Sequence, residues 1–277
     1  MEKQLKYKND LRIIDEINKD GVLYLSYPLL ADTGLVVDGF STKIGGVSKG
    51  YCKSMNISKT RGDNPEDIEE NKKLLGKVMG FDPNHMVYTH QTHTTNVKRV
   101  GKADYGKSFL DTDGLITNEK HVVLVTFFAD CVPLYFLDPV NKAIGLSHSG
   151  WRGTVNRMGK VTIEMMTKEF GTDPNDLICA IGPSICKDCF EVGDEVVDEF
   201  KKAFDKKYYD ELFERYPNGK YHIDLWKANE IVLMEAGVRW DNIAVTNVCT
   251  MENSDLLFSH RVVGFERGNL SAFLELK

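Results

Sequence analysis

The 277-residue chain predicts a mixed α/β fold, in which β-sheets are flanked by helices within a single layered domain. A continuous apolar run over 122–128 is typical of a strand that is covered on both faces. Strand-like and helix-like segments alternate, but not as regular βαβ units, which favours a mixed sheet or a pair of sheets with helices outside. The sequence shows no internal repeat and no linker rich in Pro, Gly or Ser. Residues 1–277 are therefore expected to form one domain, with 1–30 as an N-terminal extension.

The first half of the chain contains clear strand and helix boundaries. The apolar segment 34–42 predicts a strand that runs into a glycine-rich turn over 43–50. Residues 63–65 offer a helix cap followed by Pro at the first helical position, and Gly80 ends this helix. Short strands are expected next, at 86–88, 97–100 and 115–117.

The middle of the chain predicts a hairpin of two buried strands. Cys131 follows the first apolar run, and Pro133 prevents the strand from continuing unchanged because proline lacks an N–H group. The strand resumes over 134–137, residues 138–141 turn the chain, and 143–147 return as a second strand. The remaining expected elements are a helix at 150–171, a strand at 177–181, a helix at 194–204, an exposed and partly irregular insertion at 206–220, a helix at 224–236 and a strand at 243–248.

Composition and charge exclude several classes of protein. The net charge of −6 is spread along the sequence, and without a basic stripe we expect no nucleic-acid partner. No apolar run reaches about 18 residues, so no membrane span is expected. The charged segment 1–21 lacks an apolar signal core, which predicts a cytoplasmic location. In that compartment the six cysteines are expected to be thiols or metal ligands rather than disulfides.

A metal site is the main chemical hypothesis. Cys131 and His148 stand at neighbouring ends of the predicted hairpin, and His93 follows another short strand. One thiolate and two imidazoles suit zinc, with a fourth position left for water, as in a catalytic site. Such a site can hydrolyse, deaminate or polarise a leaving group.

Other interpretations of these residues remain open. A lone Cys or His beside a strand is often only a core residue, although polar neighbours are costly to bury unpaired. Without metal, Cys131 could act as a thiolate nucleophile with His148 as its base. Cys186 and Cys189 lack the upstream H-x-E of nucleobase deaminases and a second close cysteine pair, so ordinary thiols near a loop are the better interpretation.

Three arginines are candidates for binding an anion. Arg152 lies at a predicted helix start, where amide donors and the helix dipole already favour negative charge. Arg61 and Arg261 are the other two, and each alone is more often a surface residue.

Motifs along nearly the whole chain after about residue 30 carry a family resemblance. They occur at 40–48, 55–56, 62–63, 91–93, 113–114, 129–133, 148–153, 181–185, 189–192, 224–225, 249–250 and 259–261. Together they resemble the YfiH or laccase-domain proteins, once labelled multicopper polyphenol oxidases and now linked to purine nucleoside phosphorylase activity. The chain departs from the family pattern at Thr94, where Gly is usual, and at Val262, where a second Arg often follows the first.

The resemblance implies a fold similar to a group of putative cysteine hydrolases and a zinc site at His93, Cys131 and His148. It also implies phosphorolysis of adenosine, inosine and methylthioadenosine, with a side activity as adenosine deaminase. In this hypothesis Asp130 helps the metal to activate water or polarise the substrate. The candidates for substrate contacts are Asn56, Arg61, Gln91, Arg152 and Arg261. The expected partners are a purine nucleoside and phosphate, and the sequence gives no oligomeric state.

Three rival functions follow from the same residues. A copper-dependent polyphenol oxidase would use Cu²⁺ at this site, but seven histidines are few for four copper ions. A hydrolase with a cysteine nucleophile could act on a cell-wall precursor. A metal-binding or scaffold protein without turnover would have the same ligands and no substrate.

Overall fold

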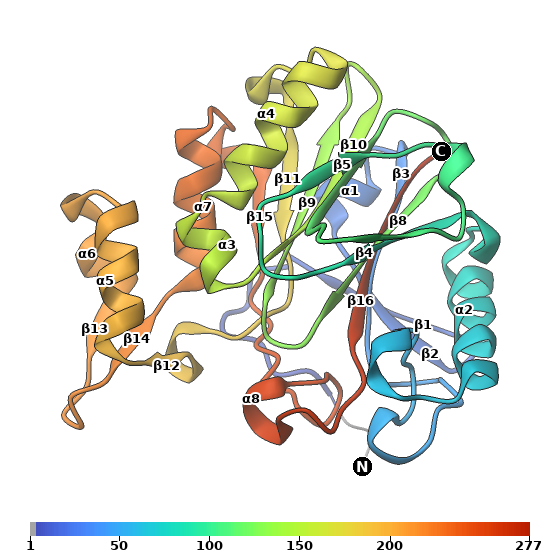
Figure 1. Ribbon diagram of the computed structural model, residues 1–277, viewed down its shortest axis with the longest axis horizontal. Helices are drawn as coiled ribbons and strands as arrows, with labels where there is room; N and C mark the ends of the chain where they lie inside the picture. Colours follow the sequence, from blue (N-terminus) through green and yellow to red (C-terminus); the bar gives the residue numbers. More distant parts are fainter. Residues whose placement is uncertain (1–3) are drawn as a thin grey trace.

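The computed structural model describes residues 4–277, which are arranged in four layers (Figure 1). A seven-stranded and a six-stranded sheet pack face to face, and helices cover their outer faces. This arrangement confirms the mixed α/β fold predicted from the sequence.

The seven-stranded sheet contains both the first and the last strands of the described chain. Its order is β1 (Asp15–Lys19), β2 (Val22–Ser26), β3 (Val36–Ser41), β16 (Leu270–Leu276), β8 (Val123–Phe128), β4 (Met86–His90) and β6 (Ser108–Leu110). Strand β4 runs parallel to β8, whereas β16 is antiparallel to β8. The ends of β4 and β8 and the start of β16 therefore meet at one edge of the sheet. Strands β1 and β2 lie within the segment 1–30 that was expected to be an extension.

The six-stranded sheet contains the predicted hairpin at its centre. Its order is β15 (Ile243–Val245), β11 (Ile178–Ile181), β9 (Val132–Asp138), β10 (Ala143–Ser149), β7 (Gly114–Thr117) and β5 (Val97–Arg99). Strands β9 and β10 are antiparallel, with Pro133 opposite His148, so the hairpin brings Cys131 close to that histidine. Pro133 lies at the second position of β9 rather than in a break between strands.

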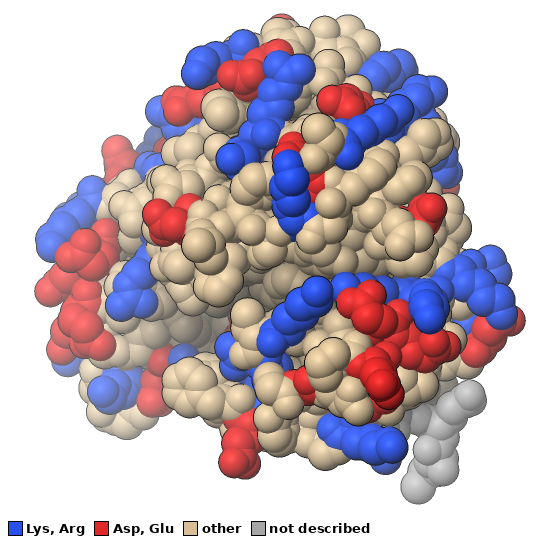
Figure 2. All heavy atoms as spheres, turned by 45° about the vertical axis from the view of Figure 1, so that its right-hand side comes forward, with Lys and Arg blue, Asp and Glu red and all other residues tan. Residues whose placement is uncertain are grey.

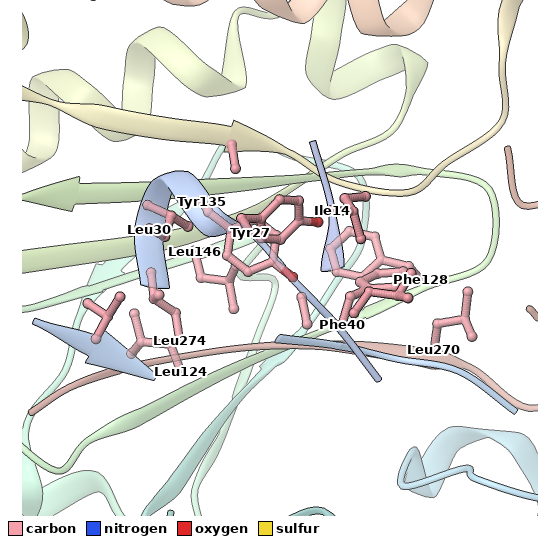
Figure 3. Close-up of a cluster of buried hydrophobic side chains, with 14 of the residues drawn as sticks. Ile14, Tyr27, Leu30, Phe40, Leu124, Phe128, Tyr135, Leu146, Leu270 and Leu274 are labelled. Atoms are coloured by element: carbon pink, nitrogen blue, oxygen red, sulfur yellow. The ribbon is translucent and has the colours of Figure 1, made fainter. Parts of the chain in front are cut away.

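Burial on both faces explains why the central strands are mostly apolar. In β8, Val123 and Val125 pack towards helix α2 (Pro65–Met79), whereas Leu124 and Phe128 point into the space between the sheets. Successive strand residues face opposite sides, so a strand covered on both faces needs apolar residues at every position. Figure 3 shows the core between the sheets, where Leu124 and Leu274 of one sheet lie near Tyr135 and Leu146 of the other.

Helix α2, which covers the seven-stranded sheet, begins and ends where the sequence provides caps. Helix α2 begins after Asn64, whose side chain accepts a hydrogen bond from the Glu66 amide, and it ends at Gly80 with a left-handed φ of 90°. The six-stranded sheet is covered by α4 (Met158–Phe170), α5 (Asp194–Ala203) and α7 (Leu225–Glu235). Short helices complete the fold: α1 (Pro28–Ala31), α3 (Trp151–Val155), α6 (Tyr209–Leu212) and α8 (His260–Val263).

Two predicted segments differ from the structure. The helix expected at 150–171 is split into α3 and α4, because Arg157 adopts a left-handed φ of 62° while its guanidinium bonds Glu235 and the Ala203 carbonyl. The insertion at 206–220 contains α6 and a strand of a small three-stranded sheet. That sheet consists of β12 (Glu191–Val192), β14 (Tyr221–Ile223) and β13 (Phe213–Arg215). It projects at one side of the molecule (Figure 1).

The surface carries charges of both signs. Figure 2 shows Lys and Arg side chains interspersed with Asp and Glu over one face of the molecule. Within residues 4–277, no helix combines the length and the apolar character needed to cross a membrane.

Candidate functional site

The three predicted metal ligands converge. The Cys131 sulfur and one ring nitrogen each of His93 and His148 lie within 4.8 Å of one another. His93 Nε2 is 3.9 Å from the Cys131 sulfur, and the two imidazole rings meet edge to face at 5.0 Å. His148 is buried, Cys131 is partly buried, and His93 is exposed. The set has the ligand number and chemistry of a zinc site with one open position.

Asp113 orients both histidines. Its carboxylate lies 2.8 Å from His148 Nδ1, which leaves Nε2 of that ring to face Cys131. The same carboxylate accepts hydrogen bonds from the backbone N–H groups of Thr92, His93 and Thr94 and from the Thr94 hydroxyl. These bonds hold the loop in which His93 has a left-handed φ of 65°. Thr94, where the family usually has Gly, thus adds a hydrogen bond to the loop.

Without metal, Cys131 and His148 form an ion pair. Burial opposes ionisation of the Cys131 thiol, but the adjacent His148 and His93 outweigh it and lower its pKa to about 6. Burial likewise disfavours the charged imidazole, but Cys131 and Asp113 raise the pKa of His148 to about 9. The thiol is therefore already a thiolate at neutral pH, as metal ligation requires.

Gly150 has no side chain, and this leaves room for the side chains of Cys131 and His93. A Cβ atom at this position would lie 3.0 Å from the Cys131 sulfur and 3.1 Å from His93 Cδ2. Both distances are shorter than ordinary van der Waals contact. A side chain at Gly150, directly after β10, would therefore require Cys131 and His93 to shift by a few tenths of an ångström.

The ligands lie in the wall of a pocket of about 340 Å³. It is built where β4 and β8 end and β16 begins. Aromatic residues Tyr88, Phe127 and Phe128 form part of its wall, and the rings of Tyr88 and Phe127 are parallel, with centroids 6.2 Å apart. Apolar walls with a few placed polar groups are typical of sites for small organic ligands.

Apart from the Cys131 thiolate, the charged side chains in this wall are cationic. Lys59, Arg61, Lys72 and Arg267 line the pocket, and no Asp or Glu does so among residues 4–277. The Nε atoms of Arg61 and Arg267 are buried and have no hydrogen-bond partner in the described chain. Burial and the neighbouring Arg61 lower the pKa of Arg267 to about 10, so the Arg267 guanidinium is still charged at neutral pH. A buried arginine beside a partly buried one, each with an unpartnered Nε, favours an anionic ligand.

Two residues that were predicted to contact substrate, Asn56 and Gln91, use their side-chain amides in hydrogen bonds within the protein. They support the pocket. Asn56 is fully buried, and its amide bonds Asp63, Ser58 and the backbone N–H of Asn269, so it joins the Arg61 segment to the start of β16. Gln91 lines the pocket, but its amide pairs with both the N–H and the carbonyl of Phe127. It thereby continues the pairing of β4 with β8.

Three further predicted residues have their polar groups directed elsewhere. The Asp130 carboxylate accepts hydrogen bonds of 2.6 Å from the Thr250 hydroxyl and from the Arg261 backbone N–H. Arg152 stacks over the Trp151 ring, and Arg261 donates to the Glu191 carbonyl. Neither arginine lines the pocket, whereas Arg61 does.

Asp113 and Arg267 were missed as functional residues by the sequence analysis. An Asp-Gly pair before the predicted strand at 115–117 was the available signal for Asp113. Arg267 precedes β16, a strand that the analysis did not place, so nothing indicated where its side chain would lie.

Replacing Asp113 with Asn is expected to weaken metal binding about 10- to 100-fold. The Asn amide can still accept from His148, but its NH₂ group cannot accept the N–H groups of Thr92 and Thr94. Competition for zinc with a chromophoric chelator would measure the change. Asp111→Asn is the matched control, because Asp111 is exposed and bonds Thr92 and Asn96 on the outside of the same loop. Equal affinity in the two variants would contradict the role given to Asp113.

Fold and site together define a mixed α/β protein with a Cys-His-His centre in a cation-lined pocket. Comparison with known proteins identifies the family: the model described as "Multi-copper polyphenol oxidoreductase laccase" matches residues 37–277, and the chain belongs to this family.

Named relatives are similar over most of their length. "Purine nucleoside phosphorylase YlmD" of Bacillus subtilis is 34% identical over 249 residues, covering 87% of this chain and 89% of the relative. "Adenosine deaminase RL5", from an unknown prokaryotic organism, is 35% identical over 241 residues, covering 84% and 91%. The crystal structure of YlmD from Geobacillus stearothermophilus superposes with a TM-score of 0.89 at 33% identity, covering 96% of this chain and 99% of that one.

Proposed function

We propose that the chain is a zinc-dependent purine nucleoside phosphorylase that acts on adenosine, inosine and methylthioadenosine, with adenosine deamination as a side activity. One observation carries the proposal: a Cys-His-His donor set shares one pocket with the buried Arg267 and the partly buried Arg61. The names of the relatives, phosphorylase and deaminase, agree with it.

The residues divide the reaction between them. In phosphorolysis a phosphate oxygen bonds to ribose C1′, the bond from C1′ to the purine nitrogen breaks, and the purine leaves with a proton on nitrogen. Arg61 and Arg267 bind the phosphate dianion through charged N–H donors. Tyr88 and Phe127 supply an aromatic wall against which the flat purine packs.

His93, Cys131 and His148 hold the metal in this proposal. Bound there, zinc supplies a Lewis acid with one position open to water or substrate. Asp113 keeps His148 in the tautomer that ligation requires, and Asp130 fixes the segment before Cys131. A copper ion would compete for the same ligands, so metal content must be measured together with activity.

The wild-type protein tests the proposal when it is given inosine with and without phosphate. We expect hypoxanthine and ribose 1-phosphate to form in equal amounts, and only when phosphate is present. Adenosine without phosphate should give inosine and ammonia instead. Purified protein should carry zinc and should not oxidise phenols. If the protein deaminates adenosine but does not cleave inosine in the presence of phosphate, the arginine pair has no function in this reaction. The proposed phosphorylase activity would then be wrong.

A further inference from the structure

A second group of metal-ligand side chains lies outside the pocket. The sulfur atoms of Cys186, Cys189 and Cys249 lie within 4.8 Å of one another, and all three cysteines are free. Cys186 and Cys249 are buried, and Cys189 is partly buried. From the sequence alone, Cys186 and Cys189 are expected to be ordinary thiols, because no second close cysteine pair accompanies them. The fold supplies the third cysteine from 63 residues further along the chain than Cys186.

Parallel pairing of β11 with β15 explains this convergence. Parallel strands end at the same edge of a sheet, so the segments that follow β11 and β15 lie side by side. Ser184 forms a parallel bridge with Cys249, and the Thr250 amide donates to the Ser184 carbonyl. Cys186 caps a single helical turn (Lys187–Cys189), which places Cys189 on the same side as Cys186.

Backbone groups around Cys249 are arranged to support a thiolate. The Cys186 N–H lies 3.4 Å from the Cys249 sulfur, and the N–H groups of Met251 and Glu252 also donate to it. Hydrogen bonds to the charged form favour it. The neighbouring Cys186 thiol favours the charged form of Cys249 further, so the three sulfurs form a donor set that a cation can bind.

A fourth donor and a compensating charge lie at the same place. The Glu252 carboxylate is 3.9 Å from the Cys189 sulfur, and its oxygen lies within 4.8 Å of the Cys186 sulfur. Lys8 makes ion pairs with Glu252 at 2.5 Å and with Asp188 at 2.8 Å. The summed negative charge of three thiolates and a carboxylate exceeds the positive charge of a divalent ion. The positive charge of Lys8 offsets part of the excess negative charge.

We propose that Cys186, Cys189, Cys249 and Glu252 bind one zinc ion at a structural site separate from the Cys131 centre. Closed tetrahedral sites made mainly of sulfur are typical of structural zinc. The ion ties the segment after β11 to the segment after β15. Both segments also hold Asp130, since Ile185 donates to its carbonyl and Thr250 to its carboxylate. The zinc site therefore supports the residue that precedes Cys131.

Zinc counting in variants tests this site independently of the proposed activity. Protein should be purified under reducing conditions, reconstituted with zinc and desalted before metal analysis. Cys189→Ser and Cys249→Ser are each expected to bind one zinc ion fewer per chain than the wild type. Cys179→Ala, which removes a buried thiol outside both clusters, should bind as many as the wild type. Because the result is a difference between variants, it holds whether or not the Cys131 centre is loaded.

Cobalt substitution and chelation identify the ligands and the structural role. In Cys131→Ala protein, cobalt should still give the strong near-ultraviolet charge-transfer band of several thiolate ligands, and adding Cys189→Ser should reduce it. A chelator should lower the thermal midpoint of Cys131→Ala but leave that of the double variant unchanged. Circular dichroism would show that Cys189→Ser, which alters a partly exposed thiol, remains folded.

Three results would overturn the proposal. One is equal zinc content in the wild type and in folded Cys189→Ser. Another is a cobalt spectrum of Cys131→Ala without thiolate bands. The third is a Cys186–Cys249 disulfide that persists in protein purified with reductant, because oxidised sulfurs cannot bind zinc in this way.

Discussion

Cys131→Ala is expected to abolish phosphate-dependent release of hypoxanthine from inosine and to remove the metal from the pocket. The loss should reach about 1000-fold, or about 4 kcal/mol, which is the scale of transition-state stabilisation that a catalytic metal supplies. Cys179→Ala is the control, since Cys179 is a buried thiol of β11 that belongs to neither group of metal-ligand side chains. Undiminished turnover by Cys131→Ala would end the proposed function.

Alkylation and chelation of the wild-type protein separate a metal ligand from a cysteine nucleophile. In metal-free wild-type protein the Cys131 pKa is about 6, so alkylation by iodoacetamide should speed up as the pH rises through 6 and then level off. Bound zinc should protect Cys131 from alkylation, and chelation should stop turnover until zinc is restored. If chelated protein keeps its activity while alkylation destroys it, Cys131 acts as a nucleophile without metal.

Local sequence patterns were sufficient to predict the half of the site that a hairpin builds. Cys131 directly precedes β9 and His148 lies near the end of β10, and these two strands are adjacent in sequence and buried at every position. Antiparallel neighbours joined by a short turn leave little choice of partner, so their proximity could be inferred from the sequence. The caps of α2 were predictable for the same reason, because Asn64, Pro65 and Gly80 act within one turn of the helix.

Contacts between segments that are distant in the sequence could not be predicted from local patterns. His93 reaches the centre because β4 pairs in parallel with β8, and Asp113 holds it from the loop before β7. Strand β16 returns from the end of the chain to the middle of the seven-stranded sheet, and that pairing brings Arg267 to the pocket. Cys249 meets Cys186 through another parallel pair. Parallel pairing requires a crossover whose destination is decided by the packing of whole sheets.

Arg267→Met is expected to raise the KM for phosphate about 10- to 100-fold, because one charged, forked donor to the dianion is lost. A hydrogen bond between charged groups contributes about 1.5–3 kcal/mol, and about 1.4 kcal/mol corresponds to a tenfold change. Met fills much of the volume of the arginine stem, and it removes a guanidinium that is buried beside Arg61. The variant should therefore stay folded, with the KM for inosine little changed.

Two controls make this result specific to the anion. Arg152→Met removes an exposed arginine that stacks on Trp151 outside the pocket, and it should leave the KM for phosphate unchanged. Deamination of adenosine requires no phosphate, so Arg267→Met should retain it. If phosphorolysis and deamination fall together, Arg267 supports the pocket through its bonds to Gly268 and Asn269, and the phosphate must bind elsewhere. A selective loss of phosphorolysis would instead show that the buried Arg267 distinguishes phosphate from water as the attacking group.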